Sequence, residues 1–363
     1  MGIVQVNLGE RSYPIIVEKG AIDRFGELLK ERGCRFIAVI ADGRVSSLWG
    51  EKLKEILEKE CINNVFLSVK PGEKSKNLAS ANRLWNQLAD NKVDRGWWIA
   101  SFGGGMVGDL AGFVAASYMR GLEFVQIPTT LLAQVDASIG GKVAVDHPKG
   151  KNLLGFFYQP KFVIVDPAFL TTLSPRQFRN GMAEVIKYGA IKDRALLELL
   201  RVNVVEIKKR EEGILAHIVE RCIEIKADYV EKDEKDILGI RAQLNFGHTI
   251  GHIIERESGY RLLHGEAVSI GMVFACIISH RLGYLTKEEL NELKSLLTLY
   301  NLPLQLRFPL KVDEIMEGLQ WDKKVKEGRI RFVLLKGLGN AFLCEEVPLN
   351  LIREVCLEIG ALA

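Results

Sequence analysis

The chain has 363 residues, 48% of them hydrophobic, which is enough for two globular domains with buried cores. Lysine and arginine total 49 against 46 aspartate and glutamate residues, so the overall charge indicates neither a nucleic-acid partner nor a membrane surface. The six cysteines form no CxxC pair, which argues against a disulfide framework and a thiolate zinc site and fits a reducing cytoplasm.

The first half of the chain alternates between two kinds of segment. The first 20 residues alternate apolar and polar side chains as a strand does, and they lack the layout of a signal peptide. Farther along, β-rich runs alternate with amphipathic helical segments, which indicates a parallel sheet with helices on its faces. We predict strands at 35–42, 64–70, 97–105, 124–128 and 161–167, and helices at 46–59, at 77–89 and from Val107. The expected fold of this half is a nucleotide-binding α/β domain.

A glycine-rich turn follows the strand predicted at 97–105. Its residues Gly103, Gly104, Gly105 and Gly108 would let the backbone approach a ligand at a helix N-terminus, where free N–H groups favour phosphate. The spacing differs from the dinucleotide motif GxGxxG, and such a turn can also serve only tight packing between helix and strand. Its place after a strand favours pyrophosphate binding.

A polar, glycine-rich run at 128–160 follows the next strand, at the sheet edge where α/β proteins bind ligands. It carries Asp136, Lys142 and Lys151. A solvated loop is the alternative. Small residues and lysines among apolar runs favour a partly buried loop that binds an anion.

The pattern changes near residues 170–178, where Ser174 is placed as a helix N-cap and Pro175 as a first-turn residue. Long helical patterns then dominate to about Leu299. They include an uncharged run at 267–279 that is too short to cross a bilayer and predicts a buried helix. Residues 329–347 predict two strands around a glycine-rich turn. The predicted domains are residues 1–174 and 175–363.

Three of the six histidines, at positions 248, 252 and 264, lie within seventeen residues. On a helix, His248 and His252 would project from one face, and a turn could bring His264 back to complete a metal site. The alternative is that His248 and His252 are capping or core histidines that bond backbone carbonyls. The third histidine weakens that alternative.

A carboxylate for the same site is available in GMAEVIKYG, which we place beside an interdomain cleft. Glu184 and Lys187 could form an ordinary surface ion pair, since they lie three residues apart. Glu184 could also supply the carboxylate that two histidines lack. Glu184, His248 and His264 would then form a zinc site with an open coordination position.

Two further polar residues precede this histidine cluster. Arg241 and Asn245 lie seven and three residues before His248, so all three could share one helical face and donate to an oxyanion. The alternative for Arg241 is an ordinary surface arginine.

The motifs GGGMVGDLAGFVAASYMRG, PTTLLAQVDASIGGK, GKNLLGFFYQP, GMAEVIKYG, LNFGHTIGH and LHGEAVSIGM follow one another in the chain. In this order and spacing they resemble the 3-dehydroquinate synthase family across essentially the whole length. The resemblance implies an N-terminal Rossmann-like NAD domain, a mainly α-helical C-terminal metal-binding domain and a cytoplasmic homodimer. The implied partner is a small sugar phosphate, with no nucleic acid and no membrane.

The resemblance also implies a reaction and its cofactors. The family is a carbon–oxygen lyase that converts 3-deoxy-D-arabino-heptulosonate 7-phosphate to 3-dehydroquinate and phosphate. The implied route is transient NAD-dependent oxidation at C5, phosphate elimination, re-reduction, ring opening and aldol closure. The implied cofactors are NAD and Zn²⁺ or Co²⁺.

Position by position, the resemblance assigns the metal to Glu184, His248 and His264 and places His252 beside the substrate for hydrogen bonding or proton transfer. The residues that it assigns to NAD are Glu73, Lys76, Gly105, Met106, Val107, Gly108, Asp109, Thr129, Thr130, Asp136, Lys142, Lys151, Phe169, Leu170, Thr171 and Thr172. Those that it assigns to substrate binding or catalysis are Arg120, Lys142, Asn152, Lys187, Lys226, Arg241, Asn245, His252, and either Lys323 or Lys324.

Three other functions remain open from the sequence. Another sugar-phosphate cyclase would act on a substrate without the carboxylate, and here both Asn245 and His252 are retained. A metal-dependent polyol or glycerol-phosphate dehydrogenase would release NADH and would not need so many cationic residues for substrate anions. A nucleotide-binding regulator without catalysis is disfavoured because all three predicted metal ligands are present.

Overall fold

The structure is a computed structural model that describes residues 2–320 and 330–363. Its contacts divide the chain into two compact units: the segment up to Leu173 with Glu212–Lys235, and Ser174–Glu211 with Asp236–Ala363. None of the helices in these described ranges is long and apolar enough to cross a membrane. Lys323 and Lys324, one of which is expected to contact substrate, lie outside the described residues.

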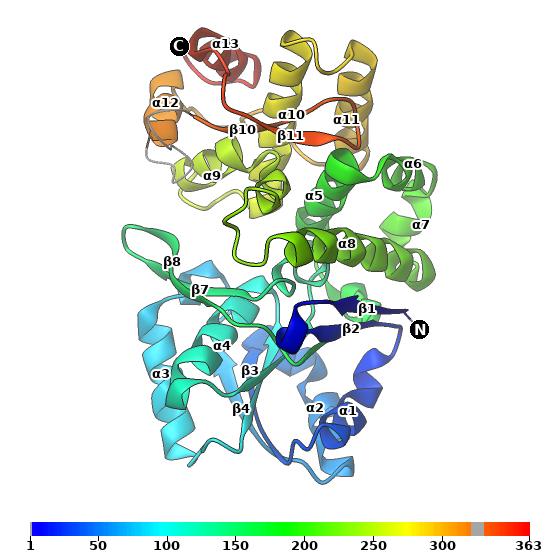
Figure 1. Cartoon of the computed structure of the whole chain (residues 1–363), viewed down its shortest axis with the longest axis vertical. Coiled ribbons are helices and arrows are strands. Elements are labelled where there is room, and N and C mark those ends of the chain that lie inside the picture. The colour runs from blue at the N-terminus through cyan, green and yellow to red at the C-terminus, as the bar shows by residue number, and fades with distance from the viewer. Residues whose placement is uncertain (1, 321–329) are drawn as a thin grey trace. The chain divides into compact units, whose positions relative to one another are not determined.

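The first unit is built on a seven-stranded sheet (Figure 1). Every neighbouring pair of strands is parallel except β1 and β2, which form an antiparallel pair at one edge. The predicted α/β class is therefore confirmed. In sheet order the strands are β1 (Gly2–Val6), β2 (Tyr13–Val17), β9 (Phe162–Val165), β6 (Glu123–Pro128), β5 (Trp98–Gly103), β3 (Phe36–Asp42) and β4 (Asn63–Val69).

Helices cover both faces of this sheet, because the central strands are apolar on both sides. In β3, Ile37 and Val39 belong to one hydrophobic core and Ala38 and Ile40 to the other, as the two-residue repeat of a strand requires. Helices α1 (Phe25–Glu31) and α2 (Gly43–Lys59) pack on the first face. Helices α3 (Leu78–Asp90) and α4 (Gly105–Ser117) pack on the second (Figure 1).

Helix α8 (Glu212–Lys232) groups with the first unit, although its sequence lies inside the predicted second domain. Its contacts within that unit include β1 and the π-helical turn η5 (Ala133–Ala137). Polar contacts add to them: the Asn7 backbone N–H donates to Glu231 at 2.7 Å, and Arg11 forms an ion pair with Glu234 at 2.7 Å. The packing of α8 therefore differs from the division at residue 174, which follows only the order of the sequence.

The run at 128–160, predicted as a partly buried loop, contains regular structure. It includes η5 and an antiparallel hairpin of β7 (Lys142–His147) and β8 (Gly150–Phe157). Val143 and Val145 point from β7 into the core beneath α4. Their alternation with Lys142 and Ala144 is the strand signal that composition alone concealed.

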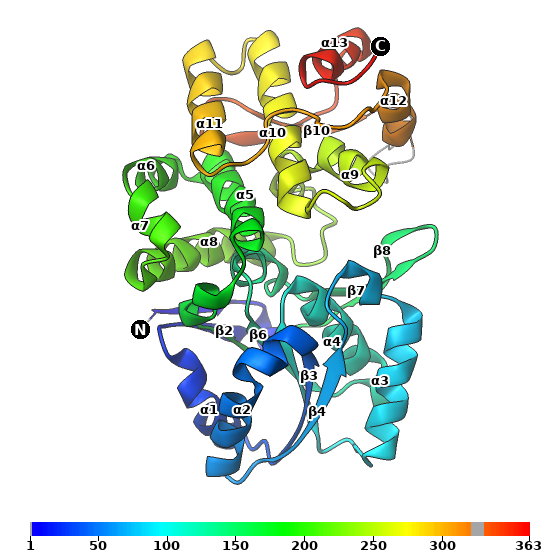
Figure 2. The same cartoon turned by 180° about the vertical axis from the view of Figure 1, so that it is seen from behind.

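The second unit is mainly helical, and α10 (His264–Arg281) is its central element (Figure 2). The helix predicted to be buried at 267–279 is confirmed, since every one of those residues is buried in α10. The predicted N-cap is confirmed too, because Ser174 Oγ accepts from the Gln177 N–H at 3.3 Å. The other elements are α5 (Pro175–Lys192), α6 (Arg194–Val202), α7 (Val204–Lys209), α9 (His248–Glu257), α11 (Lys287–Leu299), α12 (Val312–Gln320), α13 (Leu349–Glu358) and the predicted hairpin of β10 (Phe332–Leu335) and β11 (Ala341–Cys344).

Candidate functional site

Glu184 lies in the middle of α5 and is completely buried. Its ion-pair partner is Lys187, one helical turn later and only 1% exposed. The alternative of an ordinary surface ion pair is therefore wrong. Burying two charges costs several kcal/mol per ion, and their attraction alone often fails to repay it. A pair of this kind indicates a functional site more than a stabilising one.

The two predicted histidine ligands lie beside this carboxylate. His248 Nε2 is 3.6 Å and His264 Nε2 is 3.5 Å from Glu184 Oε1. One ligand atom from each of the three residues lies within 4.8 Å of the others. Both oxygens of Glu184 are buried; Lys187 pairs with Oε2, whereas Oε1 faces the two histidines and accepts no hydrogen bond within the described part of the chain, as a metal-binding oxygen would. The donor set therefore fits a zinc or cobalt ion.

Each histidine begins a helix, and the local backbone explains why. His248 follows Gly247, whose positive φ of 78° ends the preceding 3-10 turn and starts α9. The His248 Nδ1 atom contacts the Phe246 carbonyl oxygen at 3.1 Å, which leaves Nε2 facing Glu184. His264 opens α10, and the N–H of the next residue, Gly265, donates to Asn180 Oδ1 at 2.6 Å.

The expectation that Arg241, Asn245 and His248 share one helical face is wrong. Arg241–Asn245 form a separate 3-10 turn, η7, and Gly247 separates it from α9. The left-handed backbone at Gly247 changes the direction of the chain between the two elements. Arg241 is only 4% exposed, so it is not a surface arginine either.

His252 lies near the ligand cluster but outside it. Its ring centroid is 5.3 Å from that of His248 and 5.9 Å from that of His264. Its side chain is exposed, whereas His248 is buried. The geometry therefore leaves His252 accessible to a bound small molecule, and the first interpretation, in which it pairs with His248 as a ligand, is not the arrangement that the structure contains.

The electrostatics of the cluster favour a cation. Burial opposes a positive charge on His264, but hydrogen bonding and charge from Glu184 and Glu255 outweigh it and raise the pKa of His264 to about 9. Without a metal, the protein thus holds a proton at this position. The same pair of carboxylates would stabilise a divalent ion there.

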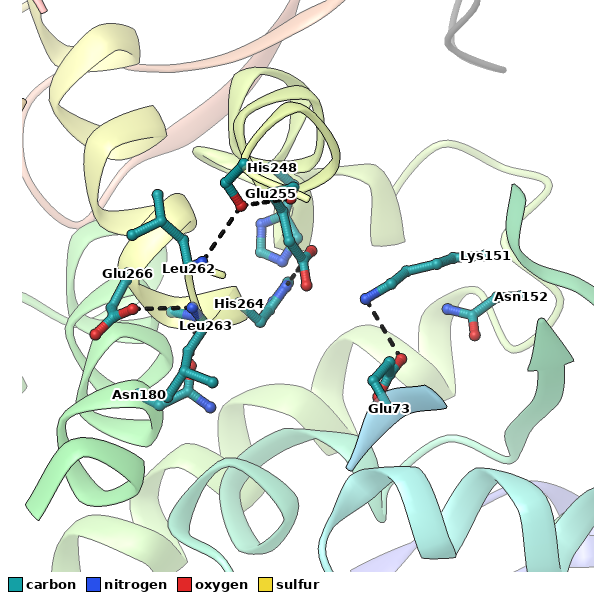
Figure 3. A network of polar contacts seen from close by, with 12 residues as sticks. Glu73, Lys151, Asn152, Asn180, His248, Glu255, Leu262, Leu263, His264 and Glu266 are labelled. Carbon is teal, nitrogen blue, oxygen red and sulfur yellow. Dashed lines mark hydrogen bonds and ion pairs between the residues drawn. The ribbon is translucent and has the colours of Figure 1, made fainter. Parts of the chain in front are cut away.

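Glu255 and Asn180 are members of this site that sequence reasoning missed. Glu255 Oε2 lies 3.6 Å from His264 Nδ1, and Figure 3 shows both side chains together. Asn180 lies one turn before Glu184 on α5 and holds the start of α10. Helical spacing could have identified both residues. Asn180 precedes Glu184 by four residues and Glu255 follows His248 by seven, so each pair lies on one side of its helix.

In the first unit, the structure brings together several residues assigned to NAD. Lys76 is almost fully buried, and its Nζ lies 2.9 Å from Glu73 and 3.1 Å from Asp109. It also donates to Asn152 Oδ1 at 2.7 Å, and Lys151 pairs with Glu73 at 3.4 Å (Figure 3). Burial opposes the charge of Lys76, but Asp109 and Glu73 outweigh it and raise its pKa.

A second group lies where strands β5 and β6 end. The two strands pair in parallel register up to Gly103 and Pro128, which places the glycine turn beside Thr129. No side chain caps α4 at Gly104, so its first N–H groups stay available to an anion. The Thr129 hydroxyl is buried without a hydrogen-bond partner in the described part of the chain. These observations fit a bound pyrophosphate.

Other assigned residues lie elsewhere in the first unit. Lys226, on α8, contacts the Asp136 carboxylate and donates to the Asp136 carbonyl at 2.5 Å.

Phe169 and Leu170 are buried, and Phe169 packs against Trp49 and Phe102, so only their backbone could meet a cofactor. The Thr171 and Thr172 hydroxyls donate to the Ala168 and Phe169 carbonyls. Met106, Val107, Gly108 and Thr130 lie in or beside the α4 turn, and Arg120 and Lys142 are exposed.

The close approach of α5 and α10 requires a glycine at position 265. A Cβ there would lie 2.1 Å from the Asn180 carbonyl oxygen. We expect Gly265→Ala to push the start of α10 away from α5, to destabilise the protein by about 1–3 kcal/mol, and to weaken zinc binding. Denaturant unfolding and a zinc competition titration measure the two effects. The control is Gly213→Ala on α8, where nothing lies within 4 Å of the added Cβ. Equal zinc affinity in the two variants would contradict this account.

The Lys76 cluster makes a prediction about pH. Burial raises the pKa of Asp109 from 3.8 to about 6, and Lys76 opposes that rise. Because the folded-state pKa lies above the unfolded value, the native state binds the extra proton. The contribution of Asp109 to stability is therefore present below about pH 4 and is lost as the pH rises through about 6. Carboxyl ¹³C NMR should find this midpoint in NAD-free protein and a higher one in Lys76→Met. A midpoint near 4 in both proteins would refute the prediction.

The chain matches two family models, described as 3-dehydroquinate synthase N-terminal over residues 66–180 and 3-dehydroquinate synthase C-terminal over residues 181–325. It is 44% identical over 366 residues to a 3-dehydroquinate synthase of Pelobacter propionicus, covering 100% of this chain and 99% of that protein.

Two solved structures are similar over nearly the whole chain. One is 2-deoxy-scyllo-inosose synthase complexed with carbaglucose-6-phosphate, NAD⁺ and Co²⁺, with 26% identity, a TM-score of 0.89, and coverage of 98% of this chain and 100% of that one. The other is ValA, a 2-epi-5-epi-valiolone synthase from Streptomyces hygroscopicus subsp. jinggangensis with NAD⁺ and Zn²⁺ bound. It has 26% identity, a TM-score of 0.88 and 98% coverage of each chain.

Proposed function

Because the chain belongs to the 3-dehydroquinate synthase family, we propose that it converts 3-deoxy-D-arabino-heptulosonate 7-phosphate to 3-dehydroquinate and phosphate. The observation that carries the proposal is the buried Glu184 carboxylate, whose Oε1 has two histidine Nε2 atoms within 3.6 Å while Lys187 pairs with Oε2. Leaving a buried carboxylate oxygen beside two ring nitrogens is costly unless a cation binds among them. The same family match and the NAD⁺-containing solved structures support NAD as the second cofactor.

We assign the metal to Glu184, His248 and His264, where a bound zinc or cobalt ion would supply a Lewis acid for substrate oxygens. Lys187 forms an ion pair with Oε2 of Glu184, and its buried ammonium group supplies positive charge toward a substrate anion. His252 is exposed next to both histidine rings, so a ring nitrogen can exchange a proton with a bound substrate. These residues would therefore bind the metal, orient the substrate and transfer a proton.

We assign NAD to the first unit, α8 included, where it would supply a hydride acceptor and donor. The uncapped α4 N-terminus and Thr129 offer donors to its pyrophosphate. The ammonium group of Lys76 pairs with both Glu73 and Asp109 and donates to the side chain of Asn152. Asn152 has a φ of 54°, a left-handed conformation that is uncommon outside glycine. Pre-ordered side chains lower the entropy lost when ligands bind.

The test is to incubate the purified protein with the heptulosonate phosphate and catalytic NAD, and to follow phosphate and NADH together. We expect one phosphate per substrate consumed, no accumulation of NADH, loss of activity with a chelator and recovery with Zn²⁺ or Co²⁺. Phosphate release from glucose 6-phosphate or sedoheptulose 7-phosphate instead would identify another cyclase. Accumulating NADH without phosphate would identify a dehydrogenase.

We further propose that the protein is a cytoplasmic homodimer that uses no nucleic-acid partner, as the family resemblance implies. The near balance of 49 basic and 46 acidic residues supports the last part. Light scattering coupled to size-exclusion chromatography tests the oligomeric state, and a mass of one chain, 40.7 kDa, would exclude the dimer.

A further inference from the structure

Glu255 is a buried carboxylate to which the proposed reaction gives no role. It lies on α9 seven residues after His248, so both side chains project from the same side of the helix. Only 6% of Glu255 is exposed, although glutamate is almost never buried unless it is paired. One group that its carboxylate contacts is the imidazole ring of His264, which comes from α10.

The His264 ring lies between two carboxylates. Nδ1 is 3.6 Å from Glu255 Oε2 (Figure 3). On the other side of the ring, Nε2 is 3.5 Å from Glu184 Oε1. A neutral imidazole carries one N–H and one lone pair, and a metal ligand must offer the lone pair. If His264 Nε2 and Glu184 both bind the metal, the ring proton must be on Nδ1, which faces Glu255. A shift of about 0.5 Å would turn this contact into a hydrogen bond of ordinary length.

The Nδ1 atom of the other histidine of the site contacts the backbone. His248 Nδ1 contacts the Phe246 carbonyl, which is part of the backbone two residues earlier. For His264, the neighbouring backbone is fixed by the hydrogen bond from the Gly265 N–H to Asn180, and that bond does not involve the imidazole ring. The side chain that faces Nδ1 of His264 is Glu255, whose Oε2 lies 3.6 Å away.

We propose that Glu255 is a positioning residue that fixes the tautomer and the orientation of His264 and thereby sets the metal affinity of the site. The inference rests on the proposed metal site and goes beyond it, since Glu255 belongs neither to the ligands nor to the residues that the family resemblance assigns. A carboxylate in this place also makes the imidazole a more basic ligand.

The experiment compares the full-length protein with Glu255→Ala, Glu255→Gln and the control Glu257→Gln. Glu257 lies on the same helix, two residues away, and pairs with exposed Arg256. Zinc affinity is measured by competition with a chelating dye, and the visible spectrum of the Co²⁺-loaded protein reports the geometry of the ligands. Denaturant unfolding followed by circular dichroism checks the folding of each variant, and NAD affinity should stay unchanged because the residues assigned to NAD lie in the other compact unit.

We expect Glu255→Ala to lower zinc affinity by roughly 10–100-fold and to change the Co²⁺ spectrum. Glu255→Gln should lose less affinity, because its amide oxygen still accepts the Nδ1–H but carries no charge. Glu257→Gln should match the unmodified protein. At saturating metal, the turnover of Glu255→Ala should recover in part. An unfolded variant would show no such recovery.

Unchanged zinc affinity and an unchanged Co²⁺ spectrum in both Glu255 variants would overturn the inference and leave the proposed function intact. If Glu255→Ala fails to fold, Glu255→Gln decides, and metal binding equal to that of the control would overturn the inference. An unmodified protein that binds neither Zn²⁺ nor Co²⁺ would overturn the proposed metal site as well.

Discussion

Replacing Glu184 with alanine is expected to remove bound zinc and to lower phosphate release by roughly 10³-fold or more, because Lewis-acid stabilisation of a transition state is worth several kcal/mol. His248→Ala and His264→Ala should do the same, since each provides one of the three converging ligand atoms. NAD affinity should stay largely unchanged, because the assigned NAD residues belong to the other unit. Metal content, phosphate release and NAD titration measure the three outcomes.

The Glu184 variant needs its own control, because it deprives Lys187 of a buried carboxylate partner. Breaking a buried ion pair costs about 3–5 kcal/mol, so the single variant could lose activity by unfolding. The double variant Glu184→Ala, Lys187→Met removes both charges and should recover much of the stability while remaining free of metal. Stoichiometric metal with near-normal activity in any one ligand variant would remove that residue from the set.

His252→Ala is expected to keep its metal and to lose roughly 10²–10⁴-fold in turnover, the range typical of a proton-transfer group. Metal binding and turnover should respond differently because of where His252 lies. It is exposed beside the ligand rings, and its nitrogens are not among the three ligand atoms that lie together. Metal analysis and the rate of phosphate release are measured on the same protein preparation.

The control for His252 is His217→Ala, an exposed histidine on α8 that has no assigned role. This variant should keep both metal and turnover. If His252→Ala loses as much metal as His248→Ala, then His252 is a ligand and its assignment to proton transfer is wrong. If it keeps both metal and turnover, it has neither role.

Several features of the fold could be predicted because they depend on neighbours in the sequence. The strand predicted at 35–42 is β3, Phe36–Asp42, since a run of apolar residues bounded by polar ones is enough to indicate a strand buried on both faces. Ser174 and Pro175 marked the start of α5 because a helix needs an acceptor for its first N–H groups. The uncharged run at 267–279 predicted a buried helix for the same local reason.

Part of the candidate site could also be predicted. Glu184, His248 and His264 have the chemistry of a zinc site and match the motifs of one family, and the structure places their ligand atoms together. Their role as metal ligands stays a prediction until metal binding is measured. The helix assumed to join Arg241 to His248 shows where spacing misleads, because one left-handed residue, Gly247, separates two turns that a periodic pattern had joined.

The sequence by itself determined the fold class, the central strands of the sheet, several helix positions and the chemical character of the site, because periodicity, capping and motif spacing act over a few residues. Only the tertiary structure decided that α8 packs with the first unit, that Lys226 meets Asp136, and that Glu255 faces His264. Those contacts join segments that are distant in sequence or separated by a turn. They depend on how apolar faces pack and on which buried charges must be paired, and neither is encoded in the spacing of any single segment.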